Sequence, residues 1–194
     1  MNGIVAIYET WIRDFEPQLK SQSSQWKHAT SPRPKKCHCQ QSKFKLMMIM
    51  VYDKNGVIVR DRVPPGSTVT VTYYRKFLQD VLRPKFCQKR SAMLPAVVLI
   101  LHDNARPRAS GAVSEILEKY GWQVVPHPPY SPDMSPPDFD LFPKLKKPLR
   151  EKRFRSIEEV SNEVTRVIRP IKNEGVLTGI QDLTKRWTAV IKHN

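Results

Sequence analysis

LMMIMVYDKNGVIVRDRV, residues 46–63, contains two apolar runs separated by the polar segment DKNG at 53–56. An Asn-Gly pair between two such runs is a strong signal for a β-hairpin, because both residues tolerate the positive φ angles of a tight turn. An earlier apolar run at 4–12 is rich in Ile and Val, which favours a further strand. The pattern therefore predicts a sheet whose first strands include an antiparallel pair.

The rest of the chain alternates between helical and strand patterns. Apolar residues at helical spacing predict a helix at 68–83, with Thr70 or Thr72 as its N-cap and Pro84 just past its end. The other expected elements are strands at 96–101 and 122–125 and helices at 109–120, 139–154, 156–172 and about 176–192. This order indicates an α/β fold in which a mixed sheet has helices on both faces.

The composition indicates one folded domain over residues 1–194 with a polyanionic partner. Of the 194 residues 40% are hydrophobic, and 33 Lys and Arg stand against 18 Asp and Glu, a net charge of +15. Such an excess favours nucleic acid as the partner, although a basic, solvated surface would give the same balance. An odd count of three cysteines suits a reducing compartment, and the longest apolar stretch, around 94–101, is too short to span a bilayer. We expect a soluble protein of the cytosol or nucleus without a membrane partner.

Two basic segments are candidate DNA-binding regions. Residues 17–45 form a long predicted loop with seven basic residues, no Asp or Glu, and interspersed Trp26 and His28, which suits phosphate contact and base stacking. The segment 143–155 has seven basic residues and one Glu. The candidate phosphate contacts in these segments are Lys27, Arg33, Lys35, Lys36, Lys144, Lys146 and Lys147. Near His28, the triplet 37–39 (Cys-His-Cys) lacks the second ligand pair that a structural zinc site needs.

Two aspartates are candidates for chemistry. Asp103 follows the buried strand at 96–101, at the end where open α/β sheets place their ligands. Asp138 follows a proline-rich segment that fixes the approach of the chain. Each could instead cap a helix. A divalent metal takes oxygen ligands from such carboxylates, and a two-metal site usually needs at least three acidic groups.

The sequence resembles the mariner-type transposases in strings that run along nearly the whole chain. The strings are LHDNARP (101–107), HPPYSPDMSPPDFDLFPKLK (127–146), SSQWKHATSPRPKK (23–36), VPPGSTV (63–69), KRF (152–154) and KRW (185–187). Asp103 and Asp138 have 34 residues between them, the separation that this family shows between its second and third catalytic aspartates.

The resemblance implies a ribonuclease-H-like fold, Mg²⁺ or Mn²⁺ as cofactor, and cleavage and joining of DNA in the nucleus. It assigns Asp103 and Asp138 as catalytic residues and metal ligands. Arg106, within LHDNARP, is a further candidate DNA contact. A homodimer is compatible with the resemblance, since relatives dimerise, but the sequence does not decide the oligomeric state. The family carries a helix-turn-helix region before this domain, and we expect that DNA reader to be absent here.

The first catalytic aspartate of the family aligns with Tyr8, in the segment AIYETW at 6–11. A phenol has a reference pKa near 10, so it is neutral at pH 7 and cannot replace a carboxylate. Glu9 cannot take over without a register slip that would also turn Val5 and Ile7 to the other face, because strand side chains alternate. The sequence therefore predicts impaired catalysis, with the metal bound weakly or not at all.

Three hypotheses remain open at this point. The first is a transposase-derived DNA-binding domain that lacks efficient cleavage. The second is a residually active metal-dependent nuclease that uses Asp103 and Asp138. The third is a non-catalytic interaction module or a non-functional remnant, which a missing cooperative unfolding transition or missing salt-dependent DNA binding would reveal.

Overall fold

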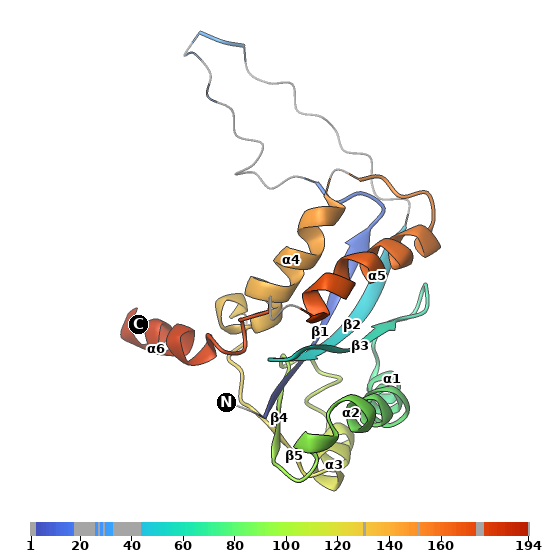
Figure 1. The fold of residues 1–194 in the computed structure, drawn as a ribbon, viewed down its shortest axis with the longest axis vertical. Coiled ribbons are helices and arrows are strands. Elements are labelled where there is room, and N and C mark those ends of the chain that lie inside the picture. Colours follow the sequence, from blue (N-terminus) through green and yellow to red (C-terminus); the bar gives the residue numbers. More distant parts are fainter. Residues whose placement is uncertain are drawn as a thin grey trace.

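The structure is a computed structural model that describes residues 3–17, 26, 28, 30–32, 44–129, 131–150, 152–173 and 177–193. Its centre is a five-stranded sheet in the order β3-β2-β1-β4-β5 (Figure 1). The strands are β1 (Ile4–Arg13), β2 (Lys45–Asp53), β3 (Gly56–Arg62), β4 (Val98–Leu101) and β5 (Trp122–Val124). Neighbours are antiparallel from β3 to β1 and parallel from β1 to β5, so the expected mixed α/β sheet is confirmed.

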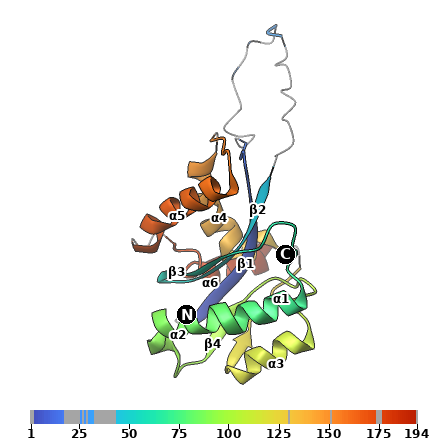
Figure 2. The same cartoon turned by 90° about the vertical axis from the view of Figure 1, so that its right-hand side faces the viewer.

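Helices cover both faces of the sheet, as Figure 2 shows. One face is covered by α1 (Val71–Lys76), α2 (Arg83–Lys89) and α3 (Gly111–Lys119). The other is covered by α4 (Phe142–Lys146) and α5 (Ile157–Asn173), and α6 (Leu183–His193) lies beside them. No helix of the described residues is both long and apolar enough to cross a membrane. The mixed sheet and its helical layers form a ribonuclease-H-like architecture.

Strand β1 divides its side chains strictly between the two cores. Ile4, Ala6 and Tyr8 lie in the core under α4 and α5, whereas Val5 and Ile7 lie in the core under α1–α3. The antiparallel pairing of β1 with β2 runs without a bulge. The pairing of β2 with β3 contains a register shift at Val51 and Tyr52. Consequently the side chains at positions 8 and 9 leave opposite faces of the strand, as the sequence predicts.

The β2–β3 hairpin forms at the expected place. Gly56 has φ 109°, a backbone conformation that an L side chain rarely adopts, and it closes the turn. The backbone N–H of Asn55 donates to Asp53 Oδ1 over 2.8 Å, which fixes the turn from within. The Asn-Gly signal therefore located this hairpin correctly.

The helix expected at 68–83 begins as predicted but ends later. Thr70 is the N-cap, since its hydroxyl accepts from the Tyr73 N–H over 3.2 Å. The chain stays helical through the π-helical segment η1 (Phe77–Leu82) and then α2, so Pro84 lies inside the helical region and not past its end. The wider π turn just before Pro84 provides room for a ring that would clash with the carbonyl of the preceding turn in a regular α-helix.

The helix expected at 139–154 changes type along its length and ends earlier. It runs without interruption through the π-helical turn η4 (Pro137–Leu141), α4, and the 3₁₀ turn η5 (Lys147–Leu149). Pro143 and Pro148 lack the N–H that a regular α-helix needs, which accounts for the changes of helix type. Two further elements start later than expected. Strand β4 starts at Val98 and not at 96, since Ala96 and Val97 are exposed, and α6 starts at Leu183 and not at about 176.

Candidate active site

The candidate site lies where β1 and β4 point the same way. The two strands are parallel, and their last registered pair is Ala6 with Leu101. Two residues further along each chain are Tyr8 and Asp103, so the sheet itself brings these positions to one edge. This is the carboxyl edge of the parallel strands, where open α/β sheets bind ligands.

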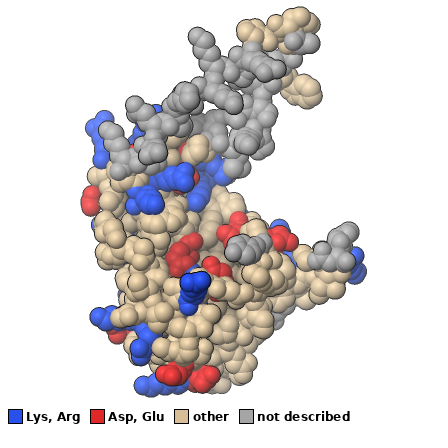
Figure 3. Space-filling model, turned by 180° about the vertical axis from the view of Figure 1, so that it is seen from behind, with Lys and Arg blue, Asp and Glu red and all other residues tan. Residues whose placement is uncertain are grey.

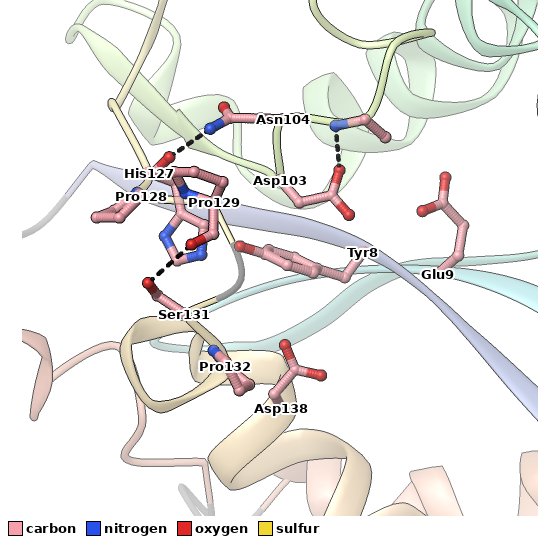
Figure 4. A pocket seen from close by; sticks show the side chains of 11 residues that line it. Tyr8, Glu9, Asp103, Asn104, His127, Pro128, Pro129, Ser131, Pro132 and Asp138 are labelled. Carbon is pink, nitrogen blue, oxygen red and sulfur yellow. Dashed lines mark hydrogen bonds between the residues drawn. The ribbon is translucent and has the colours of Figure 1, made fainter.

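Asp138 reaches the same place from the other side. The described part of the proline-rich segment 126–137 leads to η4, and Asp138 lies in the first turn of η4. Tyr8, Asp103 and Asp138 together line a cavity of about 440 Å³, with the ring of Tyr8 between the two carboxylates (Figure 4). The other lining residues are Glu9, Asn104, Ala105, His127, Pro128, Pro129, Ser131 and Pro132.

Tyr8 contributes a buried neutral hydroxyl to this cavity. The side chain is 5% exposed, and its hydroxyl makes no hydrogen bond of good geometry among the described residues. Burial raises the pKa of Tyr8 to about 12, against a smaller lowering by the nearby Ser135 side chain, so the phenol carries no charge near neutral pH. The His127 Nδ1 atom is likewise buried without a hydrogen bond in the described part of the chain. Burying polar groups without hydrogen bonds is costly, so the cavity contains hydrogen-bonding capacity that the fold does not use.

Arg108 is the charged residue beneath the cavity. Its side chain is 1% exposed and lies in ion-pair contact with Glu9 and Asp103, although its Nη1 and Nη2 atoms make no hydrogen bond of good geometry among the described residues. Its Cζ lies 5.7 Å from the ring centroids of both Tyr8 and Tyr74, within the range of cation–π attraction. Burial lowers the pKa of Arg108 to about 10, which still leaves the side chain charged at pH 7.

Backbone contacts shape the loop that carries Asp103. Asp103 Oδ1 accepts from the Ala105 N–H over 2.9 Å, and the Asn104 side chain donates to the His127 carbonyl over 2.6 Å. His102, just before them, is buried next to the Tyr74 hydroxyl, 3.3 Å from its Nδ1. Burial lowers the pKa of His102 to about 4, so this imidazole is neutral near pH 7. These contacts tie the β4 loop to the proline-rich segment across the cavity.

The donor set does not fit a pair of divalent ions. No group of three or more His, Cys, Asp or Glu side chains among the described residues is arranged to hold a metal. Glu9, Asp103 and Asp138 all line the cavity, but the Glu9 carboxylate is engaged by Arg108. A neutral Tyr8 hydroxyl is a poor ligand for a hard cation, which prefers carboxylate, carbonyl and water oxygens.

A second hollow adjoins the cavity and shares Glu9 and Asp138 with it. This groove of about 580 Å³ runs between β1 and α4, and its basic lining residues are Arg13, Lys146 and Arg150. Figure 3 shows acidic side chains gathered in the middle of the molecular face opposite that of Figure 1, with basic side chains on either side of them. In this arrangement the basic side chains could contact the phosphates of a polyanion on either side of the acidic centre.

The candidate DNA contacts are distributed unevenly. Lys147 and Arg106 are exposed and Lys146 is half-buried in the groove, whereas Lys144 forms an ion pair with Asp140 one turn earlier. Outside the described residues lie Lys27, Arg33, Lys35 and Lys36, together with the Cys-His-Cys triplet at 37–39.

Two buried charged residues near the site were not recognised from the sequence. Arg108 lies within the loop segment RPRAS (106–110), which contains one proline and no periodic pattern, so nothing in it indicates burial. Asp140 is 5% exposed and accepts from the Gly179 N–H over 2.7 Å as well as pairing with Lys144. The spacing of Asp140 and Lys144 by four residues was a usable signal for that ion pair.

The comparisons with known proteins agree with this architecture. A family model described as Transposase (partial DDE domain) matches residues 16–94. The chain is 31% identical over 195 residues to the Mariner Mos1 transposase of Drosophila mauritiana, which covers 96% of this chain and 54% of that protein. It is 29% identical over 205 residues to the human histone-lysine N-methyltransferase SETMAR, covering 100% of this chain and 28% of SETMAR. The chain thus spans about half or less of the curated relatives it matches.

Solved structures of Mos1 share the fold. The pre-cleavage Mos1 transpososome superimposes with a TM-score of 0.86 at 29% identity, over 99% of this chain and 56% of that one. The Mos1 paired-end complex with Mn gives a TM-score of 0.85 at 30% identity, over 99% and 55% of the two chains. The isolated Mos1 catalytic domain gives 0.79 at 29% identity, over 99% and 82%. The chain belongs to the mariner-type transposases and corresponds to their catalytic DDE domain.

Proposed function

We propose that this chain is a DNA-binding domain of transposase origin whose cleavage and strand-transfer chemistry is impaired. The observation that carries the proposal is the position of Tyr8, two residues past the last β1–β4 pair and level with Asp103. A family site that needs three acidic groups has a buried, neutral phenol at this point of the sheet.

Loss of one carboxylate from a phosphoryl-transfer site has a large effect. The remaining carboxylates, Asp103 and Asp138, supply too few oxygens to hold two cations beside a scissile phosphate. Removing one electrostatic contributor of this kind commonly costs a hundredfold to a thousandfold in rate. We therefore propose that the cleavage rate of the native chain lies at least about a hundredfold below that of a complete site.

DNA remains the proposed partner, through its phosphate backbone. Support comes from the net charge of +15 and from Arg13, Lys146 and Arg150 in the groove beside the cavity, although that groove also contains Glu9, Glu16 and Asp138. The related Mos1 protein is found in transpososome, paired-end and strand-transfer complexes. Because genomic DNA is the proposed partner, we also propose that the protein is located in the nucleus.

A nicking assay tests the catalytic half of the proposal. Supercoiled plasmid is incubated with the purified chain in Mg²⁺ or Mn²⁺, and the nicked fraction is compared with that of the Asp103→Ala variant. We expect equal, background nicking from both proteins. Nicking by the native chain that disappears in Asp103→Ala would overturn the proposed impairment.

That outcome would instead support the second candidate function, a residual metal-dependent nuclease. The observation in its favour is that Asp103 and Asp138 do line one cavity, where a single cation could be shared between them. The Asp138→Ala variant provides a second arm, because a one-metal nuclease would lose its nicking in both variants.

Salt-dependent binding tests the DNA half. The Lys146→Gln/Lys147→Gln double variant removes two cations from α4 and its end without breaking the Lys144–Asp140 pair. We expect a slope of log affinity against log salt that is shallower by about two, since each phosphate contact contributes about 0.9. Fluorescence anisotropy with labelled duplexes of several sequences would measure it, and all duplexes should be affected alike.

The matched control removes two exposed cations from another part of the surface. Arg60 and Arg169 lie beside a separate cavity between β3 and α5. Arg60→Gln/Arg169→Gln changes the net charge equally, so it should leave the slope nearly as steep as in the native chain. Equal slopes for the two double variants would count against the groove as the DNA path.

A further inference from the structure

The ion pairs of Arg108 form an unusual bridge at the floor of the cavity. Glu9 comes from β1 and Asp103 from the loop after β4, and the guanidinium pairs with one oxygen of each. Two carboxylates drawn to one spot repel each other unless a cation lies between them. In this chain the protein itself supplies that cation.

The bridge also consumes ligand capacity. Asp103 Oδ1 already accepts from the Ala105 N–H, and it is the same oxygen that pairs with Arg108. Asp103 therefore offers mainly Oδ2 to anything in the cavity. Glu9 Oε2 is likewise engaged by the guanidinium.

We infer that Arg108 is the resident cation of this carboxylate cluster, and that it excludes a tightly bound divalent metal even when an acidic residue is restored at position 8. The inference deepens the proposed function and rests on it, because it adds a second obstacle to metal binding beside Tyr8. In this interpretation Arg108, and not a metal ion, neutralises the negative charge of Glu9 and Asp103.

Burial makes the bridge effective. The guanidinium is shielded from water and lies between the rings of Tyr8 and Tyr74, so its charge acts on the cavity with little screening. A divalent ion at Asp103 would have to approach this fixed positive charge at close range. Coulomb repulsion at such a distance lowers metal affinity, most strongly where the effective dielectric constant is low.

Manganese titration tests the inference without using activity. Isothermal titration calorimetry with MnCl₂ is run on the native chain and on the Tyr8→Asp, Arg108→Gln and Tyr8→Asp/Arg108→Gln variants. We expect the double variant to bind Mn²⁺ at least about tenfold more tightly than Tyr8→Asp, which is a modest coupling on the scale of binding free energies. The native chain should show no saturable binding in the same concentration range.

Arg106 gives a matched control, because it lies two residues from Arg108 and is exposed. Tyr8→Asp/Arg106→Gln removes the same charge from the same loop but leaves the bridge intact. Its Mn²⁺ affinity should stay close to that of Tyr8→Asp. An equal gain for the Arg106 and Arg108 double variants would reduce the effect to net charge and overturn the inference.

Thermal unfolding provides a second readout. Mn²⁺ and EDTA should leave the Tm of the native chain unchanged, whereas Arg108→Gln should have a lower Tm that Mn²⁺ partly restores. If the Arg108 variants do not fold, the Tyr8→Asp variant still decides, since Arg108 is present in it. Saturable Mn²⁺ binding by Tyr8→Asp in the micromolar range would overturn the inference, and it would do so whether or not the native chain nicks DNA.

Discussion

Two arginine–carboxylate clusters beside the sheet differ in how completely their charges are paired. At the β2–β3 turn, Arg90 pairs with Asp53 through two bonds, Nε to Oδ2 over 2.5 Å and Nη2 to Oδ1 over 2.9 Å. At the cavity, Arg108 divides its guanidinium between Glu9 and Asp103. The first cluster is a closed pair, and the second is a bridge with carboxylate oxygens left over.

The difference shows how the same chemistry serves stability in one place and leaves a site open in another. Asp53 is 1% exposed, and both its oxygens are used, one of them also by the Asn55 N–H. The Asp103 side chain is 46% exposed and still presents an oxygen to the cavity, which the buried Tyr8 hydroxyl also lines. Polar groups left unsatisfied in a native structure are often those that a ligand once completed.

The largest expected effect comes from breaking the closed pair. Arg90→Ala would leave the Asp53 carboxylate buried without its partner, and we expect the free energy of unfolding to fall by about 3–5 kcal/mol. Chemical denaturation monitored by circular dichroism measures this. Arg60→Ala, an exposed arginine on β3, should change stability by less than about 0.5 kcal/mol. A loss below about 1 kcal/mol in Arg90→Ala would mean that the pair is not structurally important.

Lowering the pH should reduce the free energy of unfolding by an intermediate amount, and we expect the effect to come from His102, next to the cavity. His102 has a pKa of about 4 in the fold, below the value of about 6.5 for an unfolded histidine, because burial disfavours its charged form. Its contribution to stability is therefore complete above pH 6.5 and is lost as the pH falls toward 4. Between pH 6.5 and 5 the loss should be about 2 kcal/mol, at about 1.4 kcal/mol per pH unit.

The His102→Asn variant should flatten this dependence between pH 7 and 5, a range above that in which ordinary carboxylates titrate. Burial lowers the pKa of His127 as well, so a smaller slope should remain. The exposed His28 offers a control, because His28→Asn should keep the native slope. A native-like slope in His102→Asn would assign the acid sensitivity to another group.

The closed cluster and the open one also differ in how far the sequence revealed them. The DKNG turn at 53–56 located the hairpin, and alternation along β1 placed Ile7 and Tyr8 on opposite faces. Both rules depend on neighbours in the sequence, so they need no knowledge of the tertiary structure. The same locality explains the errors, since Pro84 ends a helix only where no π turn makes room for its ring.

Arg108 and Asp140 depend on partners that are distant in the sequence. Arg108 meets Glu9 only because β4 lies beside β1, and Asp140 meets Gly179 only because the chain before α6 returns to η4. A single sequence shows neither approach, and both residues look like ordinary surface charges. The cavity could thus be anticipated through Tyr8, Asp103 and Asp138, but not the cation that neutralises it.

The smallest expected effect separates the two kinds of tyrosine hydroxyl in the molecule. Tyr8→Phe removes a buried hydroxyl that makes no hydrogen bond of good geometry in the described part of the chain, so we expect stability to stay equal or to rise by up to about 1 kcal/mol. Tyr73→Phe removes a hydroxyl that donates to Asp61 over 3.0 Å, and it should cost about 1 kcal/mol. Equilibrium denaturation of both variants gives the comparison.

The sign of the Tyr8→Phe change is the informative part. A gain would show that the native chain carries an unfavourable hydroxyl at the cavity, as expected where a polar site has lost its ligand. A loss of more than about 1 kcal/mol would show instead that the hydroxyl has a bound partner in solution. In that case Tyr8 would be an integral part of a new hydrogen-bonding site, and the cavity would have to be interpreted through that partner and not through the carboxylate it replaced.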